Sequence, residues 1–140
     1  MTTEPHDFDA LSIAANRGNS RVVGERGFVR AALSLEAWYF IGVAPEDAPD
    51  EIEPLMTRVQ QSPHVLAFTD EERAEGFARA RAAQRGDAEP APVLHMAPAE
   101  AVEYLDQLRE AGVQGAHFND GDAAVTCDSA RIVDIARSGG

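Results

Sequence analysis

Three histidines are the residues of this sequence whose chemistry depends most on where the fold places them. His64, His95 and His117 each fall in a short run of strand-forming residues. If neighbouring strands align their imidazoles on one face, the three could ligate a metal ion. No His-x-His or His-Glu-x-x-His spacing supports such a site, and ordinary half-buried or edge histidines fit the same pattern. We therefore predict no metal site and keep these histidines as the candidates to test.

The sequence gives little support for a catalytic nucleophile. Cys127 precedes a predicted helix start, a position that can activate a thiol. A small buried hydrophobic residue at a strand end explains the same cysteine. The sequence contains no Gly-x-Ser-x-Gly elbow, and it has no lysine, which excludes a Ser-x-x-Lys pair. We predict no catalytic residue and no bound cofactor.

The stretch Asn119-Asp120-Gly121-Asp122 carries several oxygen ligands and superficially resembles a calcium loop. It lacks the spaced ligands and the distal glutamate of an EF-hand. Asn/Asp-Gly sequences tolerate positive φ, so the stretch predicts a hairpin turn.

A strand followed directly by a helix start organises the middle of the chain. Residues 65–68 are strand-forming, and the Thr69 hydroxyl is placed to cap the helix that follows. Glu72 lies three residues further on and completes a capping box. The acids at positions 70–72 also suit the positive end of the helix dipole, which is a sufficient reason for their presence without an acid–base role. Gly86 is the expected helix end.

The remaining elements follow from hydrophobic spacing and turn residues. We expect helices near 7–18 and over 21–35, and strands over 38–43, 55–59 and 65–68. A turn at 61–63 joins the last two of these strands, and loops cover 44–53 and 86–92. Beyond these we expect a strand over 93–96, a helix from Pro98 to Gly112, strands over 115–118 and 123–127, and a last helix capped by Asp128. The order predicts an α/β (α+β) fold, with helices packed on a mixed β-sheet of about five to six strands. We expect one domain over 1–140, with loose ends at 1–6 and 137–140.

The composition limits the partners. The formal net charge is −12, with 12 basic residues, 24 acidic residues and 44% hydrophobic residues. This balance argues against binding to nucleic-acid phosphates or anionic membranes and favours a basic partner. One cysteine cannot form an internal disulfide, and we find no targeting or membrane-length segment, so we expect a cytoplasmic protein.

Several of these motifs together resemble the N-terminal domain of the SseB family. The resemblance rests on Phe68-Thr69-Asp70 before an acidic helix, on Ala111-Gly112-Val113-Gln114-Gly115, and on a strand that closes at Phe118-Asn119. It covers roughly residues 21–127 and implies an α/β domain of that type. The motifs mark strand ends and turns, so the resemblance assigns no catalytic residue. The family name is associated with serine sensitivity and, through a shared name, with type III secretion.

The leading functional hypothesis is a non-catalytic protein-interaction or regulatory module. The acidic loop is its expected contact surface, through Glu46, Asp47, Asp50 and Glu51. Pairing of an exposed sheet edge would give a homodimer. One alternative is a small-molecule- or metal-binding protein, or an enzyme, that uses His95 and His117. A further alternative is a structural protein associated with secretion.

Overall fold

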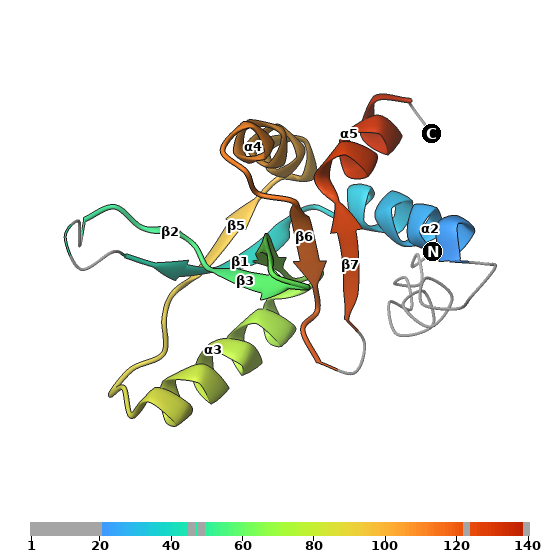
Figure 1. Ribbon diagram of the computed structural model, residues 1–140. Helices are drawn as coiled ribbons and strands as arrows, with labels where there is room; N and C mark the ends of the chain where they lie inside the picture. The colour runs from blue at the N-terminus through green and yellow to red at the C-terminus, as the bar shows by residue number, and fades with distance from the viewer. Residues whose placement is uncertain (1–20, 45–46, 48–49, 122–123, 139–140) are drawn as a thin grey trace, which may run out of the picture.

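The computed structural model describes residues 21–44, 47, 50–121 and 124–138. Four helices and seven strands follow one another in this part of the chain (Figure 1). In chain order they are α2 (Arg21–Leu33), β1 (Trp38–Val43), β2 (Glu53–Pro54), β3 (Met56–Val59), β4 (Ser62–Ala67), α3 (Glu71–Arg85), β5 (Val93–Met96), α4 (Pro98–Glu110), β6 (Gly115–Phe118), β7 (Val125–Asp128) and α5 (Ser129–Arg137). The helix predicted near residues 7–18 lies outside the described residues.

The described strands form two sheets. One has three strands in the order β2-β1-β5, and the other has four in the order β3-β4-β6-β7. Strands β4 and β6 are parallel, and the other neighbouring pairs are antiparallel. The predicted α/β (α+β) class, with helices packed on a mixed sheet, is confirmed. The described strands number seven in two sheets, where the sequence predicts five to six in one sheet.

Leu55 connects the two sheets, because it lies between β2 and β3 and bonds to a strand of each sheet. Its amide donates to the Ile41 carbonyl (2.7 Å), and its own carbonyl accepts from the Leu66 amide (3.0 Å). At the same junction Tyr39 and Phe68 exchange two backbone hydrogen bonds of 3.0 and 2.8 Å. The chain therefore changes partner strand at Leu55, which explains why residues 53–59 form two strands.

Helices cover both faces of the sheets. Helices α2, α4 and α5 lie on one face and α3 lies on the other (Figure 1). Along β1 the side chains alternate between the two faces, as in any strand: Trp38 and Phe40 join the larger core, and Ile41 joins the smaller core under α3. The Trp38 ring is fully buried and packs edge-on against Phe118, with centroids 5.1 Å apart. Its indole N–H donates to the Ala32 carbonyl at 2.7 Å.

The start of α3 differs from the prediction. Asp70 is the N-cap, with its carboxylate accepting from the Arg73 amide at 2.7 Å. Thr69 lies one residue before the N-cap, and it is buried and hydrogen-bonded to Asn119. The predicted Thr69–Glu72 capping box is therefore wrong. The predicted end is confirmed, because Gly86 has a left-handed φ of 73° and donates its amide to the last turn.

The turn between β3 and β4 is earlier than predicted. Gln60 and Gln61 both have positive φ values, of 51° and 70°, as in a two-residue type I′ hairpin turn. Ser62 and Pro63, which the sequence places in the turn, already belong to β4. The antiparallel hairpin itself is confirmed, with Val59 opposite Ser62.

The later helix ends agree with the sequence. Gly112 has a φ of 95°, and the Val113 amide donates to the Leu108 carbonyl at 3.0 Å, as in a Schellman motif. Asp128 caps α5 by accepting from the Ala130 amide at 3.0 Å. At the other end of the described chain, α2 stops at Leu33, two residues before the predicted end.

Candidate functional site

The structure does not bring the three candidate histidines together. His64 on β4 is buried, with Nδ1 2.9 Å from the Ser62 carbonyl oxygen. His117 lies on β6 of the same sheet, whereas His95 is exposed on β5 of the other sheet. Within the described ranges, no group of three or more His, Cys, Asp or Glu side chains could hold a metal ion.

His117 is engaged by two neighbouring side chains. Its Nδ1 lies 2.8 Å from Thr126 Oγ1, across the β6–β7 pair, and its Nε2 lies 3.0 Å from Asp120 Oδ1. Both ring nitrogens are thus occupied by groups of the fold. This arrangement orients the imidazole but leaves no ring nitrogen available to a substrate.

A buried polar contact joins two segments that are 50 residues apart. The Thr69 amide donates to Asn119 Oδ1 at 3.0 Å, and Asn119 Nδ2 donates to Thr69 Oγ1 at 3.1 Å. The Asn119 amide donates to the Ala67 carbonyl at 2.9 Å, and Asn119 has a positive φ of 54°. Both side chains are buried, so this contact ties the carboxyl ends of the parallel strands β4 and β6 together.

A pocket of about 460 Å³ lies beside this contact, under the first turns of α3. Its charged lining residues are Arg73 and Asp120. Arg73 Nε donates to Asp70 at 2.8 Å, and Asp120 contacts His117. We call the six residues Thr69, Asp70, Arg73, His117, Asn119 and Asp120 the closed edge, because their polar groups pair with one another.

The structure also places Cys127 and the turn that follows β6. Cys127 is 1% exposed in the core, in agreement with the interpretation as a small buried hydrophobic residue. β6 and β7 pair antiparallel on either side of this turn, so the predicted hairpin is confirmed, and Asn119 and Gly121 (122°) both have positive φ. Asp122 lies outside the described residues.

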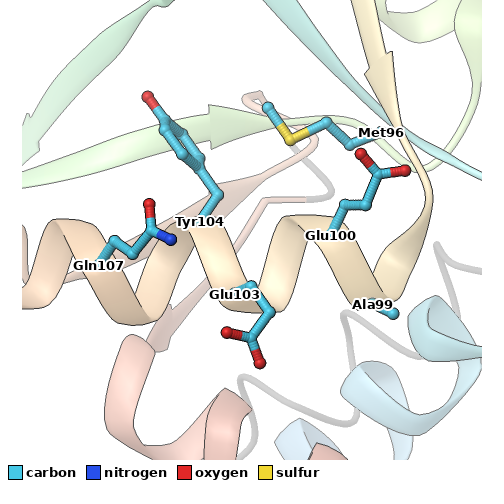
Figure 2. A pocket seen from close by; sticks show the side chains of 6 residues that line it. All are labelled: Met96, Ala99, Glu100, Glu103, Tyr104 and Gln107. Atoms are coloured by element: carbon cyan, nitrogen blue, oxygen red, sulfur yellow. The ribbon is translucent and has the colours of Figure 1, made fainter.

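A groove lies along α4 beside the end of β5. It has a volume of about 500 Å³ and is lined by Met96 of β5 and by Ala99, Glu100, Glu103, Tyr104 and Gln107 of α4. Figure 2 shows Glu100 and Tyr104 projecting from α4 toward the side where Met96 lies, while Glu103 points away on the other side of the helix. The lining contains two carboxylates and no arginine. We call these six residues the α4 groove.

Glu53 of β2 adds the negative charge of a third carboxylate near the α4 groove. Partial burial raises the pKa of Tyr104, and the negative charge of Glu53 raises this pKa further. Both effects disfavour a tyrosinate, so Tyr104 contributes an aromatic ring and a neutral hydroxyl to a negatively charged surface.

The α4 groove has a sequence signal that motif analysis misses. Glu100, Glu103, Tyr104 and Gln107 have the i, i+3, i+4, i+7 spacing of one helix stripe, beside the buried stripe that contains Leu105. The spacing predicts a shared face but does not say that Met96 of β5 completes it.

A second pocket lies on the other side of β5, against α3. It has a volume of about 470 Å³ and is lined by residues of α3 and of the loop before β5: Glu71, Glu75, Ala78, Arg79, Pro90, Ala91, Pro92 and Val93. The pKa of Glu71 is raised mainly by a side-chain hydrogen bond with Glu75, and further by the negative charge of Glu75. Arg79 lies 3.8 Å from Glu75, so this pocket, unlike the α4 groove, already contains a cation. We call it the α3 pocket.

The predicted acidic contact surface is partly described. Asp47, Asp50 and Glu51 are exposed, whereas Glu46 lies outside the described residues. Next to them Ile52 is 53% exposed, and Met56 on β3 is 37% exposed. The acidic loop therefore adjoins exposed apolar side chains.

Comparison with known proteins adds no assignment. No protein-family model matches the chain, and no curated protein matches it. In the described part of the chain, no helix has the length and apolar character needed to cross a membrane.

Proposed function

We propose that this chain is a non-catalytic, SseB-like α/β domain that acts as a cytoplasmic protein-interaction module for a basic partner protein. Two aspects of the sequence support the proposal: the resemblance of its strand-end motifs, and a formal net charge of −12. The partner class follows from charge, because a negatively charged surface attracts basic proteins and repels nucleic acids and anionic lipids.

One observation carries the proposal, and it is the composition of the α4 groove. Met96 and Tyr104 give it apolar and aromatic area, and Glu100 and Glu103 add two carboxylates without a cation among the lining residues. Aromatic and methionine side chains are enriched where proteins bind one another. By contrast, the groups expected in a reactive site, above all His117, are held by neighbours within the fold. Because His95 and His117 lie on strands of different sheets, the alternative that uses both receives no support.

Selection from a random peptide display library tests this proposal without knowledge of the natural partner. We expect the wild-type protein to enrich peptides rich in arginine and lysine. The double variant Glu100→Gln/Glu103→Gln should bind the selected peptides about fivefold more weakly, because each exposed ion pair contributes about 0.5 kcal/mol.

A matched control separates the groove from total charge. Glu110→Gln/Asp134→Asn removes the same number of charges from exposed positions outside the groove, so we expect wild-type affinity. Enrichment of acidic or purely apolar peptides would contradict the proposal, and so would equal loss of affinity in the two double variants.

A further inference from the structure

The outer edge of β5 presents backbone groups that no described strand uses. β5 is the last strand of the β2-β1-β5 sheet and pairs with β1 in antiparallel register, with Tyr39 opposite His95 and Ile41 opposite Val93. In such a pair, residues alternate between those that bond to the partner strand and those that point away from it.

The hydrogen bonds of β1 decide which β5 residues point outward. Tyr39 uses both its amide and its carbonyl on Phe68, and the Ile41 carbonyl accepts from Leu55. Tyr39 and Ile41 therefore face away from β5. It follows that the N–H and C=O groups of Val93 and His95 face away from β1, at the free edge.

A pocket flanks this edge on each side. Val93 belongs to the core under α3 and lines the α3 pocket, and His95, two residues later, shares that side. Leu94 and Met96 belong to the opposite core, and Met96 lines the α4 groove. The side chains of a strand added to β5 would therefore alternate between the α3 pocket and the α4 groove.

We propose that β5 is a docking strand, to which an extended basic segment of a partner protein adds as an antiparallel strand. This inference rests on the proposed function and specifies its binding mode. The backbone of the segment bonds to Val93 and His95. Its apolar side chains enter the α3 pocket, where Arg79 already faces Glu75, and its arginines face Glu100 across the α4 groove.

The charges disfavour a second copy of this chain as the occupant. Edge-to-edge pairing of two β5 strands would bring the glutamates of both flanking pockets close to the same glutamates of the other copy. Like charges placed opposite one another oppose such pairing, whereas arginines on the incoming strand would neutralise them.

The test uses a capped eight-residue peptide of alternating valine and arginine, labelled for fluorescence anisotropy. In antiparallel pairing, residues directly opposite one another share a face. The valines therefore lie opposite Val93 and His95, and their amides point at β5. N-methylation of the valines should weaken binding roughly tenfold or more through the loss of two hydrogen bonds. N-methylation of the arginines modifies the outward amides and should leave the affinity unchanged.

A variant of the protein tests the same contact from the other side. His95→Pro removes an N–H that faces outward and that no β1 group accepts, and proline is tolerated on the free side of an edge strand. We expect the peptide to bind His95→Pro roughly fivefold to tenfold more weakly. His95→Ala removes the imidazole but keeps this N–H, so it should weaken binding less than His95→Pro does. The N-methylated peptides leave the protein unaltered, so they decide the question if His95→Pro does not fold.

The outcomes separate this inference from the proposed function. Equal binding of the two N-methylated peptides would overturn strand addition while leaving a basic partner in place. Absence of binding by the peptide, together with a display selection that enriches no basic sequences, would overturn both. A dimer that dissociates on His95→Pro, observed by sedimentation, would show that a second copy occupies β5 and would also overturn the inference.

Discussion

Two edges of the molecule carry polar groups, and they use those groups in opposite ways. At the closed edge, Thr69 and Asn119 bond to each other, Asp70 bonds to Arg73, and His117 contacts Asp120. At β5 and the α4 groove, no strand among the described residues uses the outward backbone groups, and the glutamates are exposed. A cluster of polar side chains with complementary partners stabilises the fold, whereas a row without them is available to another molecule. The edge that is richer in catalytic residue types is therefore the poorer candidate for function.

The largest expected effect is at the closed edge, with Asn119→Ala. This change removes two side-chain hydrogen bonds to buried Thr69 and places alanine at a φ of 54°. We expect the free energy of unfolding in urea to fall by about 3 kcal/mol. Peptide binding at β5 should be unchanged under conditions in which the variant is folded.

Asn119→Gly serves as the control, because glycine accepts the positive φ but supplies no hydrogen bond. It should recover part of the loss. If Asn119→Ala proved as stable as the wild type, the closed edge would not be the structural tie that we describe.

A smaller effect tests the cap of α3. Asp70→Ala removes the carboxylate that accepts from the Arg73 amide, so we expect a loss of about 1 kcal/mol in urea unfolding. Glu72 is exposed, and the observed cap at Asp70 does not involve it. Glu72→Gln should therefore change the free energy of unfolding by no more than about 0.3 kcal/mol. The reverse order of the two effects would restore Thr69 and Glu72 as the cap.

The smallest effect concerns the open side of the molecule and depends on pH. The pKa of Tyr104 is raised, so the folded chain retains this proton at a pH where the unfolded chain has lost it. Stability therefore falls as the pH rises above about 10, the ordinary pKa of tyrosine. Tyr104→Phe has no such titration and should lose less stability between about pH 9 and pH 12. Parallel stability curves for the two proteins would argue against a partly buried Tyr104 beside Glu53.

Local patterns predict the elements well and their partners poorly. The bounds of β1 and β5, the Gly86 and Gly112 helix ends and the Asp128 cap depend on neighbouring residues, and these predictions are confirmed. Thr69 fits a helix cap equally well in sequence. Its actual partner is Asn119, 50 residues away, which no local pattern contains.

The same limit applies to the candidate site. The sequence presents three histidines on three strands but not the strand order that separates His95 from the other two. It also gives no sign that residues 53–59 change partner strand at Leu55. The free edge of β5 follows from strand order alone, so it could not be predicted from the residues of β5.

Trp38 is the only tryptophan in the sequence, and its ring is fully buried between the helices and Phe118. Its intrinsic emission therefore reports one location, at the end of β1 opposite Met96. Loss of the core moves this indole into water and shifts its emission to longer wavelength, so unfolding can be followed optically without an attached dye.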